Sequence, residues 1–254
     1  MPDKIKGIVI REKEQGEMDK TLQILTESEG VVYVRARGVR KISSSNARSA
    51  QLFSYSDYVL TEKNGFYTLK EATPIYNFFG IRTDVVSYAL ACYLCDLSSY
   101  VNVGGDEGNE IMRLLLNALY AAEKHIVDPL IIKASFEFRL SALIGFAPDL
   151  SACPVCGTDA DSIQDPMFHL MDGYIACAGC SDPEEPAGSL KPVSGPVLAA
   201  LNRILESPVN KVFLFQMKRP YLDELSRIAE EYILMRLEHR IQTLTYFKSI
   251  MAMQ

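Results

Sequence analysis

The residues best suited to chemistry are four cysteines in two close pairs. Cys153 and Cys156 form one Cys-x2-Cys pair, and after twenty intervening residues Cys177 and Cys180 form the second. Two-residue spacing lets both sulfurs of a pair face one ion, and this double arrangement is typical of zinc sites. Four thiolates would complete a tetrahedral shell, so we expect one structural Zn²⁺ ion and no catalytic metal. Disulfides or free thiols are the alternative.

Other motifs argue against an enzyme. Nucleic-acid deaminases need a His-x-Glu element, and none of the three histidines is followed by a glutamate two positions later. Zinc-protease, nucleophile-elbow and phosphate-loop signatures are also missing from the sequence. A further pair, Cys92 and Cys95, falls within an expected helix and is predicted to pack in the core. We therefore expect no catalytic residues.

A second candidate site is a cluster of cations in an acidic chain. The formal net charge is -6, yet Gly30–Gln51 contributes +5 without a single acidic residue. Its cations are Arg35, Arg37, Arg40, Lys41 and Arg48. Strand alternation would turn Val32 and Val34 to one face and Tyr33 to the other, beside two of the arginines. A ring among cations is typical of a surface that binds single-stranded nucleic acid. The alternative is a solubilising loop, or one that pairs with acidic helices of the same chain.

Short strands are expected to position these cations. Five segments are rich in β-branched or aromatic residues, namely Ile5–Arg11, Lys20–Thr26, Val31–Arg37, Leu52–Leu60 and Gly65–Ala72. Asn64-Gly65 is the strongest hairpin signal between them. So many short strands close together predict a closed five-stranded barrel, because an open sheet would leave exposed edges. We expect the oligonucleotide-binding (OB) type, with an SH3-like barrel as the alternative. The basic residues after the third strand would lie in a flexible loop.

Helices are predicted after Pro74, where apolar residues recur at spacings of three and four. The expected helices are 84–101, 110–124, 129–144, 194–206 and about 220–248. Asp84 and Asp128 stand where N-caps belong, and Asn102–Gly108 is expected to be a flexible connector. Met167–Leu170 and Gly173–Ala176 could form a hairpin between the two cysteine pairs.

Together these elements predict an α+β chain with several domains. We expect an OB-fold barrel in 1–78, a helical domain in 79–150 and 188–254, and an inserted zinc-ribbon-like element in 151–187. No apolar run is long enough to span a bilayer, and no secretory signal is expected. The sequence therefore favours a soluble cytoplasmic protein with no membrane partner.

The chain resembles the RecO family of bacterial recombinational DNA repair proteins. The most specific likeness is Phe138–Gly157, where a helix, a Gly-Phe-x-Pro turn and Cys-Pro-x-Cys-Gly follow in family order. The likeness extends to 5–41, 52–75 and 237–249. It implies an OB-fold barrel, a helical domain, a zinc-ribbon-like element, and a place in the bacterial cytoplasm with the nucleoid.

The resemblance also implies an activity. Such proteins bind single- and double-stranded DNA, anneal complementary strands and, with RecR, help to load RecA onto DNA coated by single-strand-binding protein. It assigns the phosphate contacts to the cations of 35–48 and the zinc ligands to the four paired cysteines. The apolar stripe of 220–248 is expected to be core, or alternatively a groove for the C-terminal tail of single-strand-binding protein. The alternative function is a scaffold factor acting in transcription or translation through protein contacts.

Overall fold

A computed structural model describes residues 4–100, 104–180, 186, 188–237 and 240–253. Contacts divide the chain into two compact units. The first comprises residues 1–124 and 241–254, and the second comprises residues 125–240. The first unit therefore contains the barrel region and the last helix, while the second contains all four paired cysteines.

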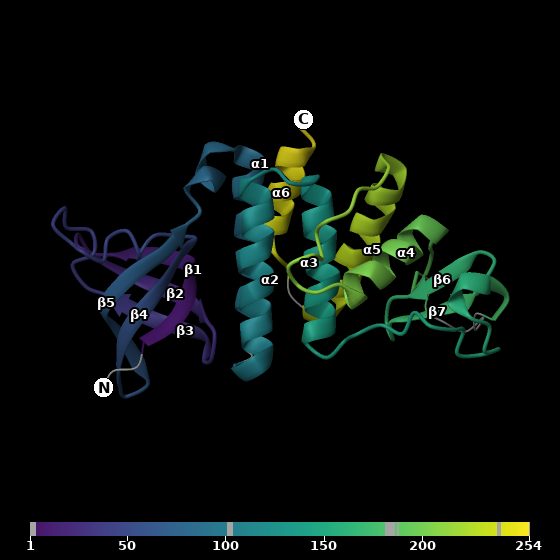
Figure 1. Cartoon of the computed structure of the whole chain (residues 1–254), viewed down its shortest axis with the longest axis horizontal. Coiled ribbons are helices and arrows are strands. Elements are labelled where there is room, and N and C mark those ends of the chain that lie inside the picture. The colour runs from purple at the N-terminus through teal and green to yellow at the C-terminus, as the bar shows by residue number, and fades with distance from the viewer. Residues whose placement is uncertain (1–3, 101–103, 181–185, 187, 238–239, 254) are drawn as a thin grey trace. The chain divides into compact units, whose positions relative to one another are not determined.

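The first unit begins with a closed five-stranded barrel (Figure 1). Its strands are β1 (Lys4–Gln15), β2 (Asp19–Thr26), β3 (Gly30–Ala36), β4 (Ser54–Lys63) and β5 (Phe66–Asn77). The order around the barrel is β1-β2-β3-β5-β4, and antiparallel pairing of β1 with β4 closes it. Strands β3 and β5 are parallel. This is the arrangement of an OB fold, so the predicted barrel type is confirmed and the SH3-like alternative is wrong.

Local sequence explains the barrel. Val32, Val34 and Ala36 are at most 6% exposed and fill its core, whereas Tyr33 is 61% exposed, as strand alternation predicts. The β4–β5 hairpin turns at Asn64-Gly65, where both residues have positive φ angles, of 54° and 78°. A two-residue hairpin turn with φ positive at both positions favours this residue pair.

The first unit also contains three α-helices. Two of them follow the barrel in the sequence, and the third lies near the C-terminal end of the chain. They are α1 (Val85–Tyr100), α2 (Gly105–Glu123) and α6 (Gln242–Met251). Asp84 accepts a 2.7 Å hydrogen bond from the Ser87 N–H, which confirms the expected N-cap. The expected start of α2 at Glu110 is wrong, because 105–108 of the predicted connector already belong to the helix. Residues 102–103 of that connector, and residue 101 of the expected helix 84–101, lie outside the described residues.

The second unit contains α3 (Pro129–Leu143), α4 (Gly195–Glu206) and α5 (Arg219–Leu237). Asp128 caps α3 by accepting a 2.8 Å hydrogen bond from the Leu130 N–H. The single helix expected over 220–248 is wrong, since α5 ends at Leu237 and α6 begins only at Gln242. Residues 238–239 lie outside the described residues.

Most of the apolar stripe on α5 is core. Its buried members, each at most 2% exposed, are Leu222, Leu225, Ile228, Ala229, Tyr232 and Ile233. Met235, by contrast, is 40% exposed. The stripe therefore packs inside the second unit as expected and does not form an open groove. Within the described residues, no helix has the length and apolar character that a membrane span requires.

A small three-stranded sheet completes the second unit. Its strands are β6 (Pro166–His169), β7 (Tyr174–Cys177) and β8 (Leu190–Pro192), in the order β7-β6-β8. The antiparallel β6–β7 pair confirms the hairpin expected between the cysteine pairs. The third strand was not predicted, because three residues are too few to show alternation.

Candidate metal centre and nucleic-acid interface

The four paired cysteines converge in the second unit. Cys153 and Cys156 lie in the loop after α3, Cys177 ends β7, and Cys180 ends the short helix η3 (Ala178–Cys180). Their four sulfur atoms all lie within 4.8 Å of one another, and the Sγ atoms of Cys156 and Cys177 are 3.6 Å apart. None of the four is in a disulfide. We call this group the cysteine cluster.

The spacing of the cysteine cluster fits a tetrahedral metal ion. With metal–sulfur bonds of about 2.3 Å, the sulfurs of a four-thiolate zinc site are about 3.8 Å apart. Gly157, next to the first pair, has a φ of 72°, and its N–H donates to the Cys153 carbonyl at 2.9 Å. This tight turn brings both sulfurs of the pair to the same side.

Electrostatics of the cysteine cluster also favour a cation. Hydrogen bonds from the backbone N–H groups of Cys177 and Cys156 lower the pKa of Cys153 to about 6. The hydrogen bond with Cys156, together with burial, raises the pKa of Cys180 to about 12. Some of the crowded sulfurs ionise easily and others resist, because like charges repel. A divalent ion would remove this conflict and stabilise all four thiolates.

Cys92 and Cys95 are separate from the cysteine cluster. Both lie in α1, where Cys95 is 1% exposed and Cys92 is half-buried. Burial raises the pKa of both thiols, which keeps them protonated. Within the described residues, the cysteine cluster is the single group of three or more potential ligands that could hold a metal. The expected core packing is confirmed for Cys95, whereas Cys92 is only half-buried.

The predicted cations lie on the barrel, in the part of the chain that we call the basic segment (residues 35–48). Arg35 is on β3, and the other four follow it before β4 begins. Every one of the five is exposed. Tyr33, two residues before Arg35 on β3, is exposed on the same face of the strand.

Two of these cations are paired with carboxylates. Arg40 lies 3.0 Å from Glu14, and its guanidinium also donates to the Gly16 carbonyl at 3.0 Å. Arg35 makes a longer contact of 3.6 Å with Asp19. Within the described residues, no ion pair or side-chain hydrogen bond involves the side chains of the remaining three. These open cations are Arg37, Lys41 and Arg48.

The basic segment is held against the barrel, contrary to the flexible loop that we expected. Val39 and Ala50 are buried in the barrel core. The Tyr58 hydroxyl donates to the Ser49 carbonyl at 2.8 Å. Asn46 donates from its side-chain amide to the Lys70 carbonyl at 3.2 Å, and its side-chain oxygen accepts from the Ala72 N–H at 3.0 Å. The cations are thus presented from an ordered surface.

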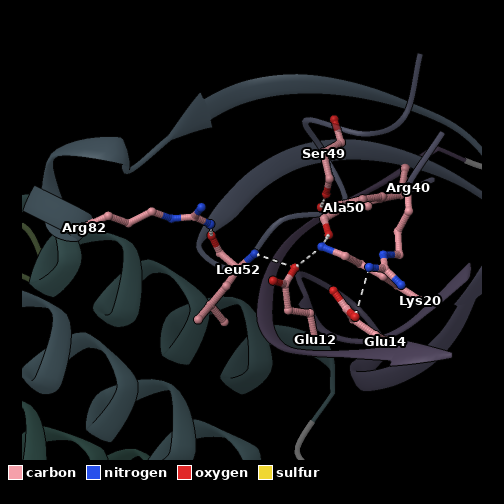
Figure 2. A network of polar contacts seen from close by, with 9 residues as sticks. Glu12, Glu14, Lys20, Arg40, Ser49, Ala50, Leu52 and Arg82 are labelled. Atoms are coloured by element: carbon pink, nitrogen blue, oxygen red, sulfur yellow. Dashed lines mark hydrogen bonds and ion pairs between the residues drawn. The ribbon is translucent and has the colours of Figure 1, made fainter. Parts of the chain in front are cut away.

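A polar network fixes the residues between the basic segment and β4 to strands β1 and β2 (Figure 2). Glu12 accepts from the Lys20 ammonium at 2.8 Å and from the Leu52 N–H at 3.1 Å. Lys20 also reaches the Ala50 carbonyl at 3.5 Å, and Arg82 donates to the Leu52 carbonyl at 2.9 Å. Sequence reasoning missed this network. The sequence feature that could have indicated this network is the alternation of basic and acidic residues at the end of β1 and the start of β2.

Two family models match the chain. The model for "Recombination protein O N terminal" covers residues 1–78, and the model for "Recombination protein O C terminal" covers residues 82–245. The chain belongs to the RecO family of DNA repair proteins.

Full-length relatives agree with this RecO assignment. The chain is 31% identical over 249 residues to the DNA repair protein RecO of Acetivibrio thermocellus, covering 97% of this chain and 96% of that protein. The RecO protein of Alkaliphilus metalliredigens is 29% identical, with coverage of 92% and 94%. That of Symbiobacterium thermophilum is also 29% identical, with coverage of 97% and 96%. Family membership favours DNA repair over the scaffold role in transcription or translation.

Proposed function

We propose that this RecO-family chain is a non-enzymatic recombination mediator. It binds single- and double-stranded DNA, anneals complementary strands and, with RecR, helps to load RecA onto DNA coated by single-strand-binding protein. Family membership supports a role in DNA repair. The observation that supports the DNA-binding step is the set of exposed cations Arg37, Lys41 and Arg48 on an ordered barrel surface, whose side chains form no ion pair with any residue that the structure describes.

Annealing would follow from charge neutralisation. Two DNA strands repel each other through their phosphates, and cations held next to one strand lower this repulsion for the second. The effect is local, because charges beyond about 10 Å are screened at ordinary salt. A net charge of -6 for the whole chain therefore does not prevent attraction at the basic segment.

The cysteine cluster would hold one structural Zn²⁺ ion, with Cys153, Cys156, Cys177 and Cys180 as ligands. The sulfur spacing supports this assignment. Four protein thiolates leave no position for substrate, so the ion would cross-link the loop after α3 to β7 and η3. No step of annealing passes through it.

RecR and the tail of single-strand-binding protein are proposed as protein partners, and RecA as an indirect one. Because the α5 stripe is mostly buried, the tail would bind another surface. We place the protein with the bacterial nucleoid. We also propose a barrel domain over residues 1–78, a limit that the family model supports, and a cysteine element over 151–187 between the helical parts 79–150 and 188–254.

Salt-dependent binding tests this proposal. Arg37, Lys41 and Arg48 are replaced together by alanine, and anisotropy of a labelled single strand is measured across a salt series. The matched control replaces Arg113, Lys211 and Lys218 by alanine. These residues are also exposed, and their replacement removes the same amount of positive charge. On single strands, each lost phosphate contact reduces the steepness of the plot of log binding constant against log salt concentration by about 0.7. The slope of the Arg37, Lys41 and Arg48 variant should therefore be smaller in magnitude by about 2.

The control variant should keep the wild-type slope. Equal effects in both variants would contradict the assignment of the site. Annealing of complementary oligonucleotides without ATP, with and without RecR, then tests the activity, and absence of DNA binding by the unmodified protein would overturn the proposed function.

A further inference from the structure

Two aromatic rings stand side by side on the outer face of the barrel. Tyr33 on β3 is 61% exposed, and Phe66 on β5 is 75% exposed. The two strands are parallel neighbours, with Val34 opposite Tyr67 in the register. One residue earlier on each strand, Tyr33 is therefore opposite Phe66. In-register residues on neighbouring strands point to the same face, and Val34 on the opposite face is fully buried.

The residues that flank these rings in the strand register include no carboxylate. In the register, Gln23 of β2 is opposite Tyr33, and Lys63 of β4 is opposite Phe66. Two residues further along β3 and β5, the next row on the same face consists of Thr21, Arg35, Thr68 and Thr61. We call these two rows the aromatic face. Its charged members are the cations Arg35 and Lys63. Asp19 lies 3.6 Å from Arg35 and partly offsets its charge, so Lys63 is the cation that most favours an anion on this face.

Phe66 is presented by a fixed turn. It follows Asn64-Gly65, whose two positive φ angles define a tight two-residue hairpin turn. Phe66 is the first residue of β5 and pairs with Lys63, the last residue of β4. A ring at this position gains little from burial in the protein, because most of its surface faces solvent. Rings beside cations are the surface on which unpaired bases stack.

We propose that Tyr33 and Phe66 stack against unpaired bases of single-stranded DNA, while the basic segment contacts its phosphates. The inference rests on the proposed function and adds Phe66 to its binding site. Stacking uses the flat face of a base and leaves its pairing edge free for a second strand. Bases inside a duplex are already stacked on one another, so the aromatic face selects single strands.

An abasic oligonucleotide separates stacking from phosphate contacts, because it keeps the phosphates and lacks the bases. The full chain should bind a normal strand about tenfold more tightly than an abasic strand of equal length. Phe66→Ala should abolish most of this difference, and Phe66→Tyr should restore it. Phe79→Ala is the matched control, because Phe79 is 49% exposed in the same unit but lies outside the barrel strands.

A fluorescent reporter gives a second measurement that does not depend on affinity. The chain contains no tryptophan, so Phe66→Trp introduces a single indole on the aromatic face. Stacking should quench its emission with the normal strand and leave it unchanged with the abasic one. Phe79→Trp should stay unquenched with both.

The outcomes distinguish this inference from the proposed function. If the unmodified chain binds normal and abasic strands equally, the stacking surface is wrong while DNA binding stands. If it binds neither strand, the proposed function itself fails. The wild-type comparison needs no substitution, so it decides the matter even if Phe66→Ala does not fold.

Discussion

The guanidinium of Arg40 lies 3.0 Å from the carboxylate of Glu14, so the protein itself partly neutralises one cation of the basic segment. Glu14 is well exposed, and its neighbours in the β1–β2 hairpin include Lys20, which pairs opposite it in the register. Because the acidic partner competes with phosphate for the same guanidinium, its charge should weaken DNA binding.

Glu14→Gln should therefore tighten binding to single-stranded DNA about two- to fivefold at low salt, since exposed ion pairs are worth at most about 1 kcal/mol. The gain should shrink as salt screens the charges. Anisotropy titration at several salt concentrations measures it. Glu17→Gln is the control, because it removes the same charge from an exposed side chain. Glu17 forms no ion pair with any of the described residues. Equal gains in both variants would show that only net charge matters.

The cysteine cluster should be a structural element of the second unit. Removing its metal with a strong chelator, or replacing Cys153 by serine, should lower the thermal midpoint of that unit, because metal binding and folding are coupled. Elemental analysis should find one zinc ion per chain in the unmodified protein. DNA binding at fixed salt should change little, because the basic segment belongs to the first unit.

Cys92→Ser provides the matched control for the metal. It removes a half-buried thiol from α1 without touching the cysteine cluster, so the zinc content should be unchanged. A preparation of the unmodified chain that folds fully without any bound metal would contradict the structural role.

Local sequence was sufficient to predict the parts that depend on neighbouring residues. Alternation placed Val34 inside and Tyr33 outside, two aspartates capped α1 and α3, and the cysteine spacing identified the cluster. Each of these features follows from geometry within a few residues.

Features that depend on distant residues were missed. Helix α2 begins early because the Gly105 N–H donates to the Ser28 carbonyl at 2.9 Å, and a Cβ on Gly104 would lie 2.8 Å from the same oxygen. The sequence did not indicate the break between α5 and α6. Leu244 and Phe247 are apolar residues three positions apart, so the helical spacing of apolar residues continues after the break. The ion pairs of Arg35 and Arg40 depend on strand register, which the sequence does not reveal.

Glu123 at the end of α2 should make the first unit sensitive to acid. Its carboxylate accepts from the Tyr76 hydroxyl at 2.6 Å and from the Gly80 N–H at 2.9 Å, and lies 3.1 Å from the Lys124 ammonium. Burial acts to raise the pKa of Glu123, but the hydrogen bonds outweigh it and lower the pKa below 4.5. The charged form thus stabilises the fold above the unfolded-state pKa, and this stability is lost as pH falls through the lower folded-state pKa.

Glu123→Gln should cost about 1 kcal/mol of unfolding free energy at neutral pH, because it weakens charge-assisted hydrogen bonds. The cost should disappear once the pH is well below 4.5. Urea unfolding of both proteins at the two pH values measures this. Glu71→Gln, at an exposed position on β5, should change little at either pH. A cost that is independent of pH would contradict the role of the charge.

A buried ammonium in the second unit gives the last prediction. Lys133 is 1% exposed, and its Nζ lies 2.9 Å from Glu137 and 2.9 Å from Glu230. Lys133→Met would leave Glu137, which is fully buried, without this counter-charge, and should cost about 3–5 kcal/mol. Lys191→Met breaks the more exposed Lys191–Glu231 pair of 2.8 Å and should cost less than about 1 kcal/mol. Adding Glu137→Leu to Lys133→Met should recover part of the loss in chemical unfolding, because it removes the buried carboxylate whose Lys133 counter-charge is gone. Equal costs for the two lysine variants would show that burial does not set the strength of these pairs.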